Sequence, residues 1–398
     1  MKILYLSRWF PFPADNGSRL RISALLEALA RAHRVDLISF TQEGAPSPDL
    51  VKAHSICHSV VTVPYSGFDP TSARSIAAFV SPLPRSVVST HSTAFAHAVE
   101  RAVATEAYDL IIASQIDMAP YALACRGVPL LLDELQVAVE LERKSTAPDF
   151  ASRVRAGLTW WKLERYLRSI LPRFGAVSVA SNIERTKIKA HIPEVAGRLE
   201  LIPNGVSMPD ETAVSPRCDD RIVYAGSVTF APNLDAVNWF AAEMLPLVVA
   251  RHPAVRLEVT GRSDGIVLSP ATAGMPVELI GYVEDVRSRI QSSRAAIVPL
   301  RVGGGTRLKI LEALALGTPV ISTSKGAEGL DLMPGRDLLI ADTPAAFADA
   351  VLCVLKDDVL HAALAQAGRN AAAHYDWRLI GPKFIALAEA VAAGRGQL

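Results

Sequence analysis

Apolar positions along the chain gather in short runs, and between these runs lie longer segments in which apolar residues recur every three to four positions. Short apolar runs are typical of parallel strands buried on both faces, and the longer segments are typical of the helices that connect them. The runs predicted as strands are 2–7, 35–40, 60–64, 110–113, 130–132, 176–180, 221–225, 256–260, 277–280, 296–300, 320–323 and 338–340. This alternation predicts an α/β fold with doubly wound parallel sheets.

The predicted helices include 20–32, 233–249, 307–316, 344–356, 359–374 and a last one from Trp377. A chain of 398 residues is too long for one ordinary core. The segment LIPNGV at 201–206 demands a turn and leads into a loop of Pro, Ser and acidic residues. We therefore expect a first domain over 1–200 and a second over 201–375.

The stretch from Ala295 to Leu330 predicts a strand, a glycine loop, a helix and a second strand. Three glycines at 303–305 leave backbone N–H groups open to a ligand. Thr306 is an acceptable N-cap for the helix 307–316, and Gly317 sits where a helix C-cap belongs. A glycine loop at a helix N-terminus is a ready anion site.

Charged residues of this helix sharpen the interpretation. Arg307 and Lys309 are predicted in the first turn, where positive side chains are unfavourable beside the positive end of the helix dipole. A bound pyrophosphate would offset the positive charge of both the side chains and the dipole. Glu312 shares a face with apolar residues, so its carboxylate needs a partner. That partner is either Lys309 in a helical salt bridge, on an ordinary glycine-rich surface turn, or a pair of vicinal sugar hydroxyls.

The segment GGGTRLKILEALALGTPVISTSKGAEGL resembles the donor-site signature of family-four glycosyltransferases (glycosyl transferases group 1), in the branch with a GGGTRLK loop. These are retaining enzymes of the GT-B fold, in which two Rossmann-like domains face each other across a cleft. The resemblance implies that the last helix, 376–398, packs back on the first domain. Gly304, Gly305 and Thr306 would hold the donor diphosphate. Arg307 and Lys309 would be the catalytic phosphate cations.

In the same family Glu312 would hold the nucleotide ribose. Gly304 stands where the family usually has the first of two glutamates, which would contact the donor sugar. The resemblance assigns further residues to donor binding, in loops that follow strands or, for Glu328, in the second glycine-bearing loop. These are Gly17, Gly226, Ser227, Arg262, Tyr282, Val283 and Glu328. Gly17 has an alternative explanation, since an ordinary strand–helix turn also favours glycine.

Polar residues at predicted strand ends are the acceptor-side candidates, because ligands of open α/β sheets gather beyond the carboxyl ends of strands. They are Ser114, Gln115, Asp133 and Glu134, together with Arg19 in the loop after the first strand. Many members of the family carry a histidine-containing HNxE-like segment here, and this chain has DELQVAVE instead.

Composition and charge narrow the functional classes. The formal net charge of +1 gives no case for a nucleic-acid partner, and the four scattered cysteines indicate reduced thiols in the cytoplasm. Neither a signal peptide nor a membrane-spanning run is evident. One basic block, 143–189, holds eleven Lys or Arg against three Asp or Glu. Its aromatic residues either pack a long helix on the first domain or place it on the inner face of the membrane.

These observations predict a cytoplasmic, metal-independent glycosyltransferase of the hexosyltransferase type. It would move a sugar from a nucleotide-diphosphate sugar to a glycan or lipid-linked acceptor, in polysaccharide or glycoconjugate biosynthesis. No cofactor is expected, and no DxD cluster for a metal stands at a strand end. One alternative is a GT-B nucleotide-sugar 2-epimerase, which would need well-placed acidic and histidine residues in the cleft. A second is a non-catalytic protein that binds nucleotide sugar or polysaccharide.

Overall fold

The computed structural model describes residues 1–42, 47–65, 81–209, 218–283, 285–305 and 307–394. The chain forms two compact units, Met1–Pro203 with Ile380–Leu398, and Asn204–Leu379. Each unit is built on a parallel sheet with helices on its faces, so the predicted α/β class with two Rossmann-like units is confirmed. Within the described ranges no helix is long and apolar enough to cross a membrane.

The first unit has a sheet in the order β3-β2-β1-β4-β5-β6-β7, with parallel pairing throughout its described ladders. The strands are β1 (Lys2–Ser7), β2 (Arg34–Gln42), β3 (Ser59–Tyr65), β4 (Leu110–Ser114), β5 (Leu130–Asp133), β6 (Ala176–Val179) and β7 (Leu199–Leu201). The strand order reverses between β1 and β4, where Ser7 pairs with Ser114. Such a switch point leaves a crevice at the carboxyl ends of the strands.

The helices of this unit connect its strands. They are α1 (Gly17–Ala32), α2 (Leu50–Ile56), α4 (Arg85–Ser89), α5 (Thr93–Thr105), α6 (Ala119–Ala124), α7 (Ala138–Ser145), α8 (Phe150–Ile170) and α9 (Asn182–His191). Helix α1 begins three residues before the predicted Leu20, because the Asn16 side chain accepts a hydrogen bond from the Arg19 N–H and caps the helix there. A short 3₁₀ turn, η1 (Ile116–Met118), follows β4.

The second unit has a sheet in the order β10-β9-β8-β11-β12-β13. Its strands are β8 (Cys218–Ala225), β9 (Arg256–Thr260), β10 (Val277–Gly281), β11 (Ser293–Val298), β12 (Val320–Ser322) and β13 (Leu339–Ile340). Its helices are α10 (Ala231–Trp239), α11 (Leu245–Val249), α12 (Val286–Gln291), α13 (Leu308–Ala315), α14 (Pro344–Lys356) and α15 (Asp358–Ala373). The switch point lies between β8 and β11. The predicted single helix 233–249 is instead α10 and α11 joined by a π-helical segment.

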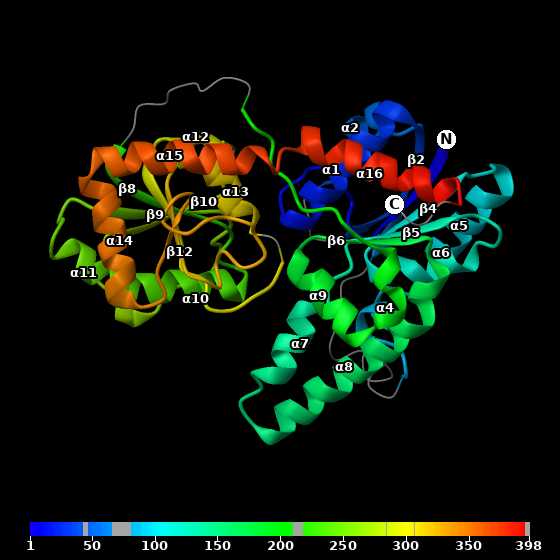
Figure 1. The fold of residues 1–398 in the computed structure, drawn as a ribbon, viewed down its shortest axis with the longest axis horizontal. Coiled ribbons are helices and arrows are strands. Elements are labelled where there is room, and N and C mark those ends of the chain that lie inside the picture. Colours follow the sequence, from blue (N-terminus) through cyan, green and yellow to red (C-terminus); the bar gives the residue numbers. More distant parts are fainter. Residues whose placement is uncertain (43–46, 66–80, 210–217, 284, 306, 395–398) are drawn as a thin grey trace. The chain divides into compact units, whose positions relative to one another are not determined.

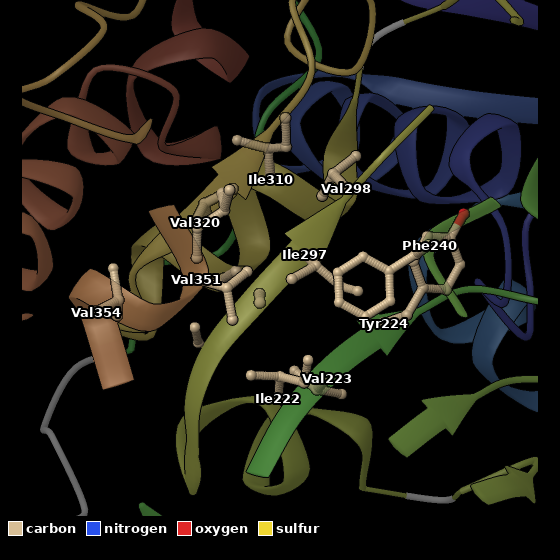
Figure 2. Close-up of a cluster of buried hydrophobic side chains, with 14 of the residues drawn as sticks. Ile222, Val223, Tyr224, Phe240, Ile297, Val298, Ile310, Val320, Val351 and Val354 are labelled. Atoms are coloured by element: carbon tan, nitrogen blue, oxygen red, sulfur yellow. The ribbon is translucent and has the colours of Figure 1, made fainter. Parts of the chain in front are cut away.

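Helices cover both faces of this second sheet. In Figure 1, α12, α13 and α15 lie on one face, and α10, α11 and α14 lie on the other. Figure 2 shows how the core fixes α13, since Ile310 meets Val298 of β11 while Val351 of α14 packs against Ile297. All four side chains are at most 1% exposed. The glycine loop that precedes α13 is therefore anchored to a rigid core.

The last helix, α16 (Trp377–Ala392), joins the first unit from Ile380 onward. Ile380 and Phe384 are completely buried. A Cβ built on Gly381 would lie 2.9 Å from the Cβ of Ala28, so α16 packs closely on α1.

Candidate functional site

The glycine loop and Arg307 form one hydrogen-bonded structure ahead of α13. The Arg307 guanidinium donates to the carbonyls of Gly303 at 2.7 Å and Gly304 at 3.1 Å, and to that of Lys325 at 3.3 Å. Arg307 therefore ties the glycine loop to the loop that follows β12. Gly303 and Gly305 have φ values of 108° and 84°, which side-chain-bearing residues rarely adopt.

The prediction that Arg307 lies inside the first helical turn is wrong. Arg307 has non-helical dihedrals, φ −81° and ψ 68°, and occupies the N-cap position, so α13 begins at Leu308. The side chain turns back to the loop carbonyls instead of following the helix. The predicted N-cap, Thr306, lies outside the described residues.

Lys309 reaches from α13 to the carboxyl end of β8. Its ammonium donates to the hydroxyl of Tyr224 at 2.7 Å and to Oδ1 of Asn233 at 3.1 Å, and it lies 4.0 Å from the centre of the Tyr224 ring. Asn233 in turn donates to the Ser227 carbonyl at 2.8 Å. A Cβ built on Gly226 would lie 2.8 Å from the ammonium, so glycine at this position makes the approach possible.

The charge of Lys309 has no carboxylate counter-ion among the described residues. Burial, together with the neighbouring positive charge of Arg307, lowers the pKa of the Lys309 ammonium to about 7. The alternative in which Lys309 forms a helical salt bridge with Glu312 is wrong, because the ammonium is directed at Tyr224 and Asn233. An anion is the ligand that this arrangement fits.

Glu312, one turn further along α13, is half-buried. Burial raises the pKa of its carboxyl group, and the positive charge of Arg287 opposes that rise. The described part of the chain supplies no hydrogen bond to this carboxylate. Both oxygens are thus available to accept hydrogen bonds from ligand hydroxyls.

The other donor-site candidates of this unit lie in loops around the same sheet. Gly226 and Ser227 follow β8, and the Ser227 hydroxyl donates to the carbonyl of Arg262 after β9 at 3.0 Å. The Arg262 side chain is exposed. The remaining candidates are Tyr282, which is 73% exposed, the half-buried Val283, and Glu328, whose carboxylate pairs with Lys325.

In the first unit, two residues with unusual backbone meet beyond β4 and β5. Gln115 and Glu134 have φ values of 70° and 60°, a strained region that non-glycine residues seldom occupy and that is found most often at functional sites. The Gln115 side-chain amide donates to Oε2 of Glu134 at 3.1 Å, and Gln136 donates to Oε1 at 3.0 Å. Burial raises the pKa of the Glu134 carboxyl group.

Asp133, beside Glu134, is completely buried and forms a bidentate ion pair with Arg21. The guanidinium donates to Oδ2 at 3.1 Å and to Oδ1 at 2.7 Å, and it also donates to the Ile202 carbonyl at 2.9 Å. Ser178 donates to the same carboxylate at 2.5 Å. This network fixes the end of β5, so Asp133 holds the backbone that presents Glu134.

The remaining acceptor-side candidates are Ser114 and Arg19. Ser114 is buried at the end of β4. Arg19 is buried and pairs with Asp15 at 2.9 Å. Gly17, a donor-side candidate, is the exposed first residue of α1. The structure thus brings Gln115, Asp133 and Glu134 together and directs Arg19 to its own loop.

Sequence reasoning missed several residues that complete these clusters. Tyr224 and Asn233 hold Lys309, and Arg21 holds Asp133. A tyrosine near the end of a buried strand was the available signal, because a buried phenol usually needs a hydrogen-bond partner. In the described ranges no group of three or more His, Cys, Asp or Glu side chains is placed to hold a metal ion.

Comparisons with known proteins agree with this architecture. Residues 219–357 match the family model described as "Glycosyl transferases group 1". The phosphatidyl-myo-inositol mannosyltransferase of Mycobacterium tuberculosis is 30% identical over 204 residues, which are 48% of this chain and 54% of that protein. The match thus spans about half the length of the curated relatives.

Solved structures resemble the whole chain in fold. The sucrose-phosphate synthase of Thermosynechococcus elongatus superposes with a TM-score of 0.69 at 19% identity and covers 99% of both chains. HepE of Anabaena, in complex with UDP and glucose, gives a TM-score of 0.62 at 14% identity over 99% of this chain and 100% of that one. The chain therefore has the GT-B fold, and its residues 219–357 match the family model Glycosyl transferases group 1.

Proposed function

We propose that this protein is a retaining, metal-independent glycosyltransferase that uses a nucleotide-diphosphate sugar as donor. The observation that carries the proposal is the half-buried Lys309, whose ammonium has neutral oxygen partners and no carboxylate counter-ion among the described residues. Such a charge is unfavourable unless an anion occupies the site. A diphosphate beside Lys309, Arg307 and the N-terminus of α13 would supply that anion.

The donor nucleotide would be oriented by residues around the same switch point. The unpaired carboxylate of Glu312 would accept hydrogen bonds from the ribose hydroxyls. Backbone groups of Gly226 and Ser227 lie beside Lys309 and would contact the phosphates. The relation to HepE, which was solved with UDP and glucose, supports a nucleotide sugar as donor.

In the reaction, the bond between the anomeric carbon and the diphosphate oxygen would break, and the departing diphosphate would gain negative charge. Arg307 and Lys309 would stabilise that charge in a preorganised site, which is the electrostatic role that a divalent metal has in other transferases. The acceptor hydroxyl would attack on the same face that the diphosphate leaves. The phosphate oxygen would take the hydroxyl proton, so that no separate base is needed.

The acceptor would be a glycan or lipid-linked molecule that binds near Gln115 and Glu134. Strained backbone at both residues and a buried carboxylate are typical of functional positions. The related mannosyltransferase of Mycobacterium tuberculosis carries phosphatidyl-myo-inositol in its name, which supports a lipid-linked acceptor.

Helix α8 would bring the protein to such an acceptor at a membrane surface. Phe150, Val154, Leu158 and Trp161 are 79%, 54%, 46% and 50% exposed, and their spacing places them on one side of the helix. Arg165 is exposed beside this side and lies 5.6 Å from the Trp161 ring centre. An apolar stripe flanked by arginine suits the interface of an anionic bilayer.

Donor binding is tested by the melting temperature of the protein with UDP-, GDP-, ADP- and dTDP-sugars, each with and without EDTA. A ligand that binds the native state raises the melting temperature by mass action. We expect one nucleotide class to give a shift that EDTA does not change and that Glu312→Ala abolishes. The exposed Glu243→Ala is the matched control and should retain the shift.

The absence of a shift with every nucleotide sugar would overturn the donor site. A shift without any sugar transfer to lipid or glycan acceptors would instead identify a binding protein. Transfer that stops in EDTA would contradict metal independence. The anomeric configuration of the product, read by NMR, tests retention.

A further inference from the structure

The first unit contains an apolar pocket that the proposed donor and acceptor sites do not use. It has a volume of about 680 Å³ and lies between α4, α6, α8 and η1. Val87, Tyr121, Tyr166 and Ile170 are buried residues of its wall, and the exposed Leu83 lies at its rim. Pockets that bind small molecules have volumes of about 300–1,000 Å³ and largely apolar walls, so this one is large enough for a substantial ligand.

One polar group in the wall lacks a partner. Asp117 is 3% exposed, and its Oδ2 pairs with Arg8, which offsets the carboxylate charge. Its Oδ1 is buried and accepts no hydrogen bond from the described residues. Buried polar atoms are nearly always hydrogen-bonded, so an unsatisfied carboxylate oxygen in a pocket wall indicates a missing donor. A ligand hydroxyl would be such a donor.

The pocket is connected to the acceptor-side residues through one loop. Asp117 follows Gln115 by two positions, and Gln115 donates to the Glu134 carboxylate. The pocket therefore begins directly beyond the strained turn at the end of β4. Tyr166 and Ile170, in the second half of α8, line it, while the first half of the same helix exposes the apolar stripe that begins at Phe150.

We propose that this pocket binds the alkyl or isoprenoid chain of a lipid-linked acceptor, with a hydroxyl of the ligand donating to Oδ1 of Asp117. The inference rests on the proposed function and narrows its acceptor from glycan or lipid to lipid. Ser81, His91 and Arg173 also line the pocket, but most of its wall is apolar. A free glycan fits such a wall less well than a chain does, because many of its hydroxyls would lose hydrogen bonds to water against apolar side chains. A chain with one hydroxyl group matches a mostly apolar wall that has one unsatisfied acceptor among the described residues.

Calorimetric titration with octyl β-glucoside, kept below the concentration at which it forms micelles, tests the pocket. Methyl β-glucoside is the comparison, since it has the same sugar without the chain. We expect the octyl compound to bind at least tenfold more tightly. Ala124→Trp, at an exposed position in the pocket wall, should weaken that binding at least tenfold by filling the entrance. Ala104→Trp, at an exposed position of α5 away from the wall, should leave it unchanged.

The role of Asp117 is tested by 1-octanol against methyl octyl ether, which lacks the donating hydroxyl. The alcohol should bind more tightly than the ether. Equal affinity of these two would overturn the hydrogen bond to Asp117. Octyl glucoside affinity that survives Ala124→Trp, or that equals the affinity of the methyl compound, would overturn the pocket as a chain site.

Failure of this inference is separable from failure of the proposed function. Nucleotide-sugar binding is measured on the same Ala124→Trp protein by its melting temperature. Should the nucleotide sugar bind while octyl glucoside does not, only the chain site is wrong. Should octyl glucoside bind while no nucleotide sugar does, the donor function is wrong and the pocket is an independent lipid site.

Discussion

The stability of the Lys309 ammonium depends on whether an anion is bound beside it. Its partners Tyr224 and Asn233 are neutral, so the ammonium is poorly stabilised when no ligand is present. That is the physical reason for its lowered pKa. A bound diphosphate would raise the pKa again, because an opposite charge favours the protonated form. Under the proposed function, Lys309 would therefore couple protonation to donor binding.

This coupling predicts that nucleotide-sugar affinity falls as pH rises above about 7, the pKa of Lys309 in the free protein. The decline would reach at most about tenfold per pH unit, since one proton is linked to binding. Isothermal titration between pH 6.5 and 8.5 measures it with an intact nucleotide sugar, whose diphosphate diester does not titrate in that range. Lys309→Met should bind weakly at every pH. A wild-type affinity that does not change with pH would contradict the assignment.

The same pKa predicts the opposite trend for stability of the free protein. Lys309 titrates near 7 when folded and near its ordinary 10.5 when unfolded, so between these values the unfolded state holds more protons. The free energy of unfolding therefore gains a contribution from this residue as pH rises from about 7 to about 10.5. Urea unfolding at pH 7 and 9 should show that gain in wild type and a smaller one in Lys309→Met.

At the scale of elements, α8 has one buried face and one face that exposes apolar side chains. The buried face of α8 carries Trp160, Leu163 and Leu167, which pack within the first unit. For this face, the alternative in which the long helix packs on the first domain is sufficient. The opposite face exposes Phe150, Leu158 and other apolar residues, which packing alone does not explain. Trp160 and Trp161 thus have different environments, because adjacent helical positions point about 100° apart.

The exposed face predicts vesicle binding. Phe150→Ser combined with Leu158→Ser and Trp161→Ser should abolish co-sedimentation with vesicles of phosphatidylcholine and phosphatidylglycerol, since the apolar contact is lost. The melting temperature should change little, because these side chains are exposed. Val359→Ser with Leu379→Ser removes apolar residues that are 81% and 52% exposed elsewhere and serves as the control. Failure of the wild-type protein to co-sediment with the anionic vesicles would contradict the proposed membrane role.

At the scale of the whole molecule, the chain returns to its first unit at the end. Helix α16 buries Phe384 and Leu387 there after the second unit is complete. The stability of the first unit therefore depends on residues that follow the second unit in sequence. The first unit thus consists of two separate segments of the chain, whereas the second is the continuous segment Asn204–Leu379.

This arrangement predicts that Phe384→Ala destabilises the first unit and not the second. Loss of a buried Phe costs about 3–5 kcal/mol, which corresponds to a fall of about 6–20 °C for a unit of this size. Differential scanning calorimetry separates the transitions, and a nucleotide sugar should raise only that of the second unit. The exposed Leu379→Ala is the control. A fall in the nucleotide-sensitive transition instead would contradict this assignment of α16.

The sequence alone determined the α/β class, most strands and the glycine loop ahead of α13, because periodicity and turn residues are local properties. Tertiary structure decided the partners of the site residues. Lys309 meets Tyr224 and Asn233 across 85 and 76 positions, and Arg21 meets Asp133 across 112. No local pattern encodes such contacts, since they arise only when sheet order brings distant strand ends together. The pocket beside Asp117 exists for the same reason, because elements that are separate in the sequence form its walls.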